Sequence, residues 1–380
     1  MSSPQSSPRS SSRSPDILVV GAGIIGCAVA FELAERGASV SVIDDRPIGM
    51  GATRASAGVL APYIEARDGG PLVDLTKRSL DLYDGFVARL SAAARPQVRY
   101  HRTGTLDVAL TEAALARLAD AADQLATQGV DARLLSANAV RVEVPHVTAN
   151  ALGGLSIPVH GFVSAAGLTR ALADEATRHG VRIEQGCRIG RIASTGDDVS
   201  VETDRGKLAA ARVVLAAGAW SAQIEVEGAL PAPVRPIRGQ LLQLAARGPA
   251  LPQVMWGERC YLVPWDDGTL LVGATVEDVG FDEGATASGV GGLLEAAQEL
   301  VPTISQMGFV EARAGLRPAT ADHLPIIGPS VAVPGLVYAT GHYRNGILLA
   351  PLTAMLAADV ILDGGADPLL ALTRPARFGL

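Results

Sequence analysis

The order of apolar and polar positions along the chain predicts both strands and helices. Residues 16–20 form an almost continuous apolar run that ends at a glycine, which is typical of a short buried strand. Over 23–36 the apolar positions recur every three or four residues, which predicts a helix that ends before the next glycine. A second apolar strand is predicted over 39–43. Strand, helix and strand in this order are half of a βαβ unit.

The same two periods recur further along the chain. Helical spacing predicts further helices over 73–94, 111–128, 165–179 and 347–362. Apolar or alternating runs predict several short strands within 182–202 and further strands over 212–217, 234–245, 260–264, 269–274 and 336–340. Signals of the βαβ type fall at the start, middle and end, and antiparallel signals fill the gaps. We therefore expect two interleaved α/β domains.

Composition narrows the class of protein. The 380 residues are 48% hydrophobic, enough for two globular domains, whereas the Ser/Pro/Arg-rich segment 1–15 predicts a disordered tail. A net charge of −7 without a basic cluster argues against nucleic-acid or anionic-membrane partners. The three cysteines and six histidines lack metal-ligand spacing, which predicts no metal site and fits the cytoplasm. The apolar runs at 17–31 and 347–358 are too short to cross a membrane.

The motif GAGIIG at 21–26 is the first with chemical content. Its first glycine allows a tight turn, the second lets backbone amides approach a pyrophosphate, and the third lets the helix pack against the sheet. The start of the helix adds a partial positive charge. Asp44 ends the second strand, where its carboxylate can accept hydrogen bonds from ribose hydroxyls. These features predict bound FAD or NAD rather than NADP.

Small residues fill the stretch from Gly51 to Pro62, directly after the second strand. Such residues allow a backbone to lie against a flat ligand such as a flavin ring. In an alanine-rich chain they fit an ordinary loop equally well, so this stretch does not decide between flavin and nicotinamide.

Six segments resemble the flavin-dependent D-amino-acid oxidase family, and within it the glycine oxidase branch of the thiazole-biosynthesis type. They are GAGIIG at 21–26, ASAGVLAP at 55–62, VVLAAGAWS at 213–221, CYLVP at 260–264, GLRPATADHLPIIGP at 315–329 and ATGHYRNGILLAP at 339–351. The resemblance spans about 17–362 and implies non-covalent FAD. It also implies the fold class: a Rossmann-like FAD-binding domain with an interleaved α+β substrate domain built on a mainly antiparallel sheet.

The resemblance implies a division of the chain. The expected segments are a discontinuous FAD-binding domain at 16–90, 150–225 and 313–365, a substrate domain at 91–149 and 226–312, and a C-terminal tail at 366–380.

The resemblance also implies the catalytic residues. Arg317 would clamp the substrate carboxylate through two parallel hydrogen bonds, Tyr261 would donate its hydroxyl to the same carboxylate, and Arg344 would lie at the mouth of the site. The cofactor-binding residues expected from the motifs and the resemblance are Gly21, Gly23, Ile24, Ile25, Gly26, Asp44, Ala55, Ser56, Ala57, Gly58, Ile189, Ala217, Gly218, Trp220, His342, Arg344, Asn345, Gly346 and Ile347.

The implied reaction is oxidative deamination of glycine, small amines or D-amino acids by hydride transfer to flavin N5. Reoxidation by O₂ would give hydrogen peroxide, and the imine would yield glyoxylate and ammonia or feed thiazole and thiamine biosynthesis. The expected partners are therefore a small amino acid, O₂ and thiazole-synthesis enzymes, with a homo-oligomer as the assembly.

Three other functions compete with this interpretation. The nearest is a D-amino-acid or N-methyl-amino-acid (sarcosine-like) dehydrogenase or oxidase with another electron acceptor. A nicotinamide dehydrogenase would leave the motifs at 315–351 unexplained. A flavin-binding protein without activity would have no use for Arg317 and Tyr261. Two departures from the family pattern, Arg259 in place of a histidine and Val276 in place of a methionine, leave the preferred amine open.

Overall fold

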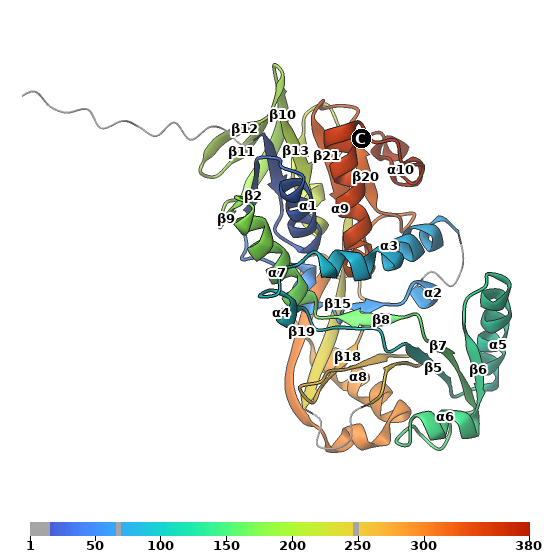
Figure 1. Ribbon diagram of the computed structural model, residues 1–380. Helices are drawn as coiled ribbons and strands as arrows, with labels where there is room; N and C mark the ends of the chain where they lie inside the picture. The colour runs from blue at the N-terminus through green and yellow to red at the C-terminus, as the bar shows by residue number, and fades with distance from the viewer. Residues whose placement is uncertain (1–15, 66–69, 246–250) are drawn as a thin grey trace, which may run out of the picture.

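The computed structural model describes residues 16–65, 70–245 and 251–380 of the chain. The expected disordered tail at 1–15 lies outside these residues. Figure 1 shows strands and helices from both ends of the chain gathered in the upper part of the molecule, above a second, larger sheet.

The upper sheet is of the Rossmann type and has the strand order β20-β21-β13-β1-β2-β9. Neighbouring strands pair in parallel, except that β20 runs antiparallel to β21. Its strands are β1 (Ile17–Val20), β2 (Val40–Asp44), β9 (Arg182–Gln185), β13 (Arg212–Leu215), β20 (Ile326–Pro329) and β21 (Leu336–Thr340). Segments from the start, middle and end of the sequence thus meet in one sheet, as the interleaved pattern predicted.

Helices cover this sheet and bury its parallel strands. Helix α1 (Ile24–Glu35) packs against α7 (Ala165–Arg178) and α9 (Gly346–Asp363), and α9 also contacts α3 (Pro71–Ala88). Because its neighbours enclose α1, every residue from Ile24 to Ala34 is buried. The apolar composition of this helix therefore reflects a core position.

Helix α9 is the one helix, among the residues that the structure describes, with the length and apolar composition of a membrane span. Here it is a core helix, and contacts with α3 complete its hydrogen bonding. Pro351 has no N–H to offer the carbonyl of Ile347, and the hydroxyl of Tyr83 donates to that carbonyl instead at 2.6 Å. Ser79 donates to the carbonyl of Leu348, also at 2.6 Å. Burial therefore accounts for the apolar sequence of α9.

The lower sheet has eight strands in the order β19-β15-β18-β17-β16-β5-β7-β6. Its neighbours pair antiparallel except for β16 and β5, so the sheet is mixed. Its strands are β5 (Thr105–Ala109), β6 (Arg133–Ser136), β7 (Gly153–Ile157), β15 (Arg235–Ala245), β16 (Val254–Trp256), β17 (Tyr261–Pro264), β18 (Thr269–Gly273) and β19 (Gly308–Ala319).

Shorter elements complete the fold. Helix α8 (Ala287–Leu300) packs on β15 and β18, whereas α5 (Glu112–Thr127) and α6 (Ala137–Glu143) pack on β7. A four-stranded sheet and a three-stranded sheet lie beside the two large ones. The four-stranded sheet consists of β10 (Ile189–Thr195), β11 (Asp198–Thr203), β12 (Gly206–Ala210) and β14 (Glu225–Val226). The three-stranded sheet consists of β3 (Val59–Leu60), β4 (Tyr100–His101) and β8 (Gly161–Val163). The remaining short α-helices are α2 (Pro62–Glu65), α4 (Arg95–Val98) and α10 (Leu370–Thr373).

The structure confirms the expected fold class. It differs from the sequence-based prediction in the bounds of one helix, in the sheet to which two strands belong and in the C-terminal segment. The helix expected over 73–94 ends at Ala88, and a separate short helix begins at Arg95. Strands β7 and β19 pair within the lower sheet, although the expected boundaries at 150 and 313 place β7 and most of β19 with the FAD-binding segments. The tail at 366–380 packs on the molecule: Thr373 donates to the carbonyl of Ile327, and Leu380 is buried.

Candidate active site

A cavity of about 760 Å³ runs between the carboxyl ends of the upper strands and the face of the lower sheet. Ligands of α/β sheets bind at such strand ends. All the predicted site residues line this cavity except Gly26 and Asn345. Gly26 packs against the turn, which is the role expected of a third glycine, and Asn345 is the buried N-cap residue of α9.

The turn after β1 forms one end of the cavity. Gly21 has a φ of +110°, and a Cβ there would lie 2.5 Å from the carbonyl oxygen of Ala216, so the backbone itself requires glycine. Gly23 is different, because its backbone is extended and a Cβ would meet only the hydroxyl of Thr53, at 3.6 Å. The described protein atoms do not demand glycine at this position. A dinucleotide lying against the backbone would, so the turn fits the cofactor.

Asp44, at the end of β2, holds the backbone on either side of it at this end of the cavity. Its Oδ2 accepts the N–H of Ala22 at 2.6 Å, and its Oδ1 accepts the N–H of Arg46 at 2.8 Å. Burial raises the pKa of this carboxyl group, although the two backbone donors oppose the shift. Each oxygen keeps a lone pair, so the carboxylate has the capacity to accept further hydrogen bonds, such as those from ribose hydroxyls.

Two contacts at this end were not predicted from the sequence. The hydroxyl of Thr53 accepts the N–H of Ile24 at 3.2 Å and so caps the first turn of α1. The guanidinium of Arg46 lies 4.0 Å from the ring centre of Trp220 and forms an ion pair with Glu283 at 2.8 Å. Trp220 therefore lines the cavity with its ring stacked against the guanidinium of Arg46. Thr53 lies inside the small-residue stretch 51–62, and that stretch was the signal that could have identified it.

Two helices begin at the cavity wall. Ile24 and Ile25 of α1 line the cavity, as do Gly346 and Ile347 of α9. The partial positive charge at each helix start would therefore face a ligand bound in the cavity. His342, just before α9, is buried and shares a hydrogen bond of 2.9 Å with Thr353; burial lowers its pKa to about 3.

At the other end of the cavity Tyr261 and Arg317 project from strands β17 and β19. These strands are separated by β18 and β15 in the sheet order. A Cβ at Gly273 would overlap the ring and hydroxyl of Tyr261, and a Cβ at Gly239 would overlap the guanidinium of Arg317. The two glycines thus leave the space that the two predicted catalytic side chains occupy, and sequence reasoning did not single out either glycine.

The hydrogen bonds of Arg317 leave one edge of its guanidinium for a ligand. Its Nη1 donates to the carbonyl of Thr275 at 2.8 Å and to the carbonyl of Arg238 at 3.3 Å. A guanidinium has five N–H donors, and those on Nε and Nη2 remain for a ligand. The Nε–Nη2 edge matches the two oxygens of a carboxylate. Burial raises the pKa of Tyr261, so its hydroxyl stays protonated and can donate.

Charged residues surround this end of the cavity. Arg344 forms an ion pair with Glu65 at 3.0 Å, and both line the cavity. Arg259 also lines the cavity but is held by Glu295 at 3.0 Å and Glu299 at 2.7 Å on α8. Val276 lines the cavity with 58% of its surface exposed, so the wall is open at this position.

A Rossmann-type sheet with this turn, joined by one cavity to a facing Tyr–Arg pair, defines the class of protein as a dinucleotide-binding oxidoreductase. Comparison with known proteins makes this specific. The chain belongs to the family of FAD dependent oxidoreductases, which it matches over residues 16–360. Its cofactor is FAD, as the resemblance implied and as one of the two cofactors that the motifs left open.

The relatives include glycine oxidase of Geobacillus kaustophilus, which is 36% identical over 91% of this chain and 92% of its own length. A bifunctional ThiO/ThiG protein of Nostoc sp. is 37% identical over 94% of this chain. The chain spans 54% of that relative, or about half its length.

Solved structures agree with these matches. The crystal structure of glycine oxidase from Geobacillus kaustophilus superimposes with a TM-score of 0.88 at 32% identity and covers 93% of this chain and 96% of its own. Iminodiacetate oxidase from Chelativorans sp. superimposes with a TM-score of 0.85 at 27% identity and covers 94% of this chain and 98% of its own.

Proposed function

We propose that the protein is an amino-acid oxidase that deaminates glycine, and small amines or D-amino acids, with O₂ as the electron acceptor. The observation that supports this proposal is that Tyr261 and Arg317, on the lower sheet, line the same cavity as Gly21 and Gly23 in the turn after β1 of the upper sheet. A dinucleotide on that turn would extend toward a site made for a carboxylate. The products would be hydrogen peroxide, ammonia and glyoxylate or its imine.

The residues present fit non-covalent FAD. The Gly23 backbone and the start of α1 would hold the pyrophosphate, and Asp44 would hold the ribose. The small residues 55–58, Ile189 and the start of α9 would line the rest of the cofactor, since all of them face the cavity. When bound, FAD supplies the hydride acceptor for oxidation of the substrate Cα–H.

Arg317 and Tyr261 would orient the substrate. A carboxylate on the Nε–Nη2 edge of Arg317 would form two parallel charge-assisted hydrogen bonds, worth on the order of 1.5–3 kcal/mol. The protonated hydroxyl of Tyr261 would add a third donor. With the carboxylate fixed, the amine and the Cα–H have few positions left, so the clamp sets which hydrogen is removed. A substrate that enters with a neutral amine needs no protein base.

A link to thiazole synthesis is part of the proposal. The Nostoc relative is by its name a bifunctional ThiO/ThiG protein, and this chain spans about half of it. We propose that the imine or glyoxylate formed here feeds a separate thiazole-synthesis enzyme. We propose that the protein acts in the cytoplasm and that its working assembly is a homo-oligomer.

A second candidate is oxidation of N-substituted glycines, such as an N-methyl-amino acid. The exposed wall at Val276 and the structural match to an iminodiacetate oxidase favour it, because an N-substituent needs room beside the clamp. Such a substrate would keep the carboxylate contacts and change only the amine side.

The deciding experiment is a visible spectrum of the purified protein, followed by anaerobic addition of glycine. Flavin bands that bleach with glycine and return with air, together with hydrogen peroxide, would support the proposed function. Bands that bleach only with sarcosine would support the second candidate, whereas bands that bleach only with a D-amino acid would keep the proposed function and change its preferred substrate. Protein that contains FAD and reacts with none of these would refute both.

A further inference from the structure

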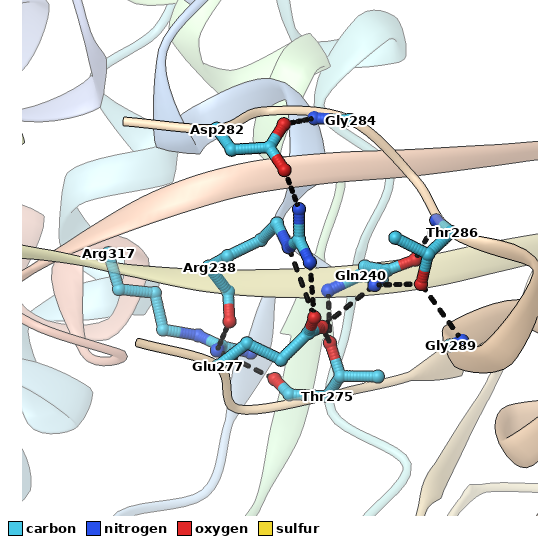
Figure 2. Close-up of polar contacts among 9 residues, drawn as sticks. All are labelled: Arg238, Gln240, Thr275, Glu277, Asp282, Gly284, Thr286, Gly289 and Arg317. Carbon is cyan, nitrogen blue, oxygen red and sulfur yellow. Dashed lines mark hydrogen bonds and ion pairs between the residues drawn. The ribbon is translucent and has the colours of Figure 1, made fainter. Parts of the chain in front are cut away.

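The hydrogen-bond acceptors of Arg317 belong to a partly buried polar network whose other members do not line the cavity. Figure 2 shows the carbonyl oxygens of Arg238 and Thr275 beside its Nη1, with the carboxylate of Glu277 between the two segments that carry them. Arg238 lies on β15, and Thr275 and Glu277 lie just after β18. The position of Arg317 therefore depends on how these two segments are held together.

Glu277 holds the segments through both of its carboxylate oxygens. Its Oε2 accepts from Arg238 Nη2 at 2.5 Å and Nε at 3.2 Å, and its Oε1 accepts from the Thr275 hydroxyl at 2.5 Å and Gln240 Nε2 at 2.7 Å. Although burial acts in the opposite direction, these donors hold the pKa of Glu277 below its ordinary value. Glu277 is therefore the centre of the network.

The network runs from a buried to an exposed side: Gln240 is fully buried, whereas the side chain of Glu277 is 24% exposed and that of Asp282 is 59% exposed. The side chain of Arg238 is 5% exposed and also pairs with Asp282 at 2.5 Å. Without the Glu277 carboxylate, a buried guanidinium would keep one carboxylate partner and the Thr275 hydroxyl would lose its acceptor. Gln240 Nε2 would keep only the Thr286 hydroxyl. Backbone hydrogen bonds between Arg238 and Glu277, at 2.8 and 3.0 Å, would still join the two segments. The side chains around them would rearrange toward new partners or water, and the adjoining carbonyl groups would be held less firmly.

Apolar packing does not hold this segment in place. Val276, between the two network residues, is 58% exposed and lines the cavity. Gly239 lies between Arg238 and Gln240 in the sequence and leaves the space for the Arg317 guanidinium. The network residues are thus next to the two carbonyl groups that accept from Arg317 and next to the space at Gly239 that its guanidinium occupies.

We propose that Glu277 is a positioning residue for Arg317: by joining Arg238 to Thr275 it fixes the two carbonyl oxygens that orient the guanidinium. This inference rests on the proposed function, because it gives Arg317 the role of carboxylate clamp. With Nη1 held by two carbonyls, the Nε–Nη2 edge faces the substrate. With those carbonyls displaced, the guanidinium can rotate and lose one of its two parallel hydrogen bonds to the carboxylate.

The test uses Glu277→Gln in the FAD-loaded enzyme. Glycolate, which has a hydroxyl in place of the amine of glycine, serves as a carboxylate probe, and its Kd is measured from the perturbation of the flavin spectrum. We expect the Kd to rise roughly tenfold, as expected when one of two parallel charge-assisted hydrogen bonds is lost. The KM for glycine should rise by a similar factor, with a smaller change in kcat.

The matched control is Asp278→Asn. Asp278 pairs with Arg235 at 2.6 Å and joins the same two segments, but both side chains are more than 60% exposed. This variant should bind glycolate like the wild type. In an Arg317→Gln background, Glu277→Gln should have no further effect on the Kd, because its effect passes through Arg317. A merely structural role would give additive losses.

The outcomes separate the inference from the proposed function. Wild-type enzyme that binds FAD but not glycolate would overturn both. Wild-type binding that Glu277→Gln leaves unchanged would overturn the inference alone. Should Glu277→Gln not yield folded enzyme, Glu277→Asp takes its place, because a side chain one methylene shorter keeps the charge but cannot reach Arg238 and Thr275 together. The same rise in Kd is expected, and an unchanged Kd would again refute the inference.

Discussion

Replacing Gly239 by alanine should damage substrate binding while leaving the fold intact. A Cβ at this position would overlap the guanidinium carbon and both terminal nitrogens of Arg317. The overlapping atoms are the far end of a flexible side chain, so Arg317 can move aside without disturbing the backbone of β15. It cannot move aside and still keep its bonds to the carbonyls of Arg238 and Thr275.

The size of the effect follows from the contacts that Arg317 would lose. Two parallel charge-assisted hydrogen bonds to a carboxylate are worth on the order of 1.5–3 kcal/mol. The value of kcat/KM for glycine should therefore fall about 10- to 150-fold, at 1.36 kcal/mol per factor of ten. Because the overlap is with a mobile group, the free energy of unfolding should change by about 1 kcal/mol or less.

Steady-state kinetics, FAD content and thermal unfolding would be measured on the same preparations. Gly308→Ala is the matched control, since it lies on β19 and a Cβ there would meet only Ala245, at 3.8 Å. That variant should keep wild-type kinetics. In an Arg317→Met background the change at Gly239 should cost nothing more. FAD-loaded Gly239→Ala enzyme with wild-type kcat/KM would show that Arg317 does not clamp the substrate.

Three further predictions follow from the site. Gly273→Ala should displace the ring of Tyr261. The KM for glycine should then rise roughly tenfold, because one hydrogen bond to a charged group is lost. An unchanged KM would exclude a substrate contact by Tyr261. Asp44→Ala should weaken FAD binding at least roughly tenfold in an equilibrium titration, because a charged acceptor for ribose is lost, and wild-type affinity would contradict the assigned role. Burial lowers the pKa of His342 from an ordinary 6.5 to about 3. Below pH 6.5 the unfolded chain therefore binds a proton that the folded protein does not, and stability should fall on acidification by at most about 1.4 kcal/mol per pH unit. His342→Gln should lose this component between pH 5 and 6.5, whereas equal pH slopes for the two proteins would mean that folded His342 is protonated.

The local geometry around the glycine-rich turn could be predicted from the sequence. The turn at 21–26, the helix after it and Asp44 lie within one βαβ-type unit, where spacing along the chain determines spacing in the fold. Each glycine of the turn has a local physical role, and the structure shows that role directly at Gly21 and Gly26. Periodicity also located α5 and α7, because each has one apolar face and a polar N-cap residue.

The eight-stranded sheet could not be predicted from the sequence in the same way. Strand β19 follows α8, and its partner β15 lies more than sixty residues earlier in the chain, so no short-range pattern announces their pairing. Apolar spacing also failed to show where β7 belongs. It pairs with β5 and β6 in the lower sheet, but its neighbours in sequence lead into α7 of the upper part.

The strands around Tyr261 and Arg317 show why the pairing register, and not the motifs, determines which residues surround these two side chains. Arg317 lies opposite Ile237, and Tyr261 lies opposite Gly273, with β15 and β18 between the two side chains. Side chains two residues apart on a strand share a face, so Gly239 faces the same side as Arg317. Any larger residue at 239 or 273 would fill the space over which Tyr261 and Arg317 extend. The proposed clamp thus depends as much on two positions without side chains as on the two that carry them. Only the register of four strands identifies those positions.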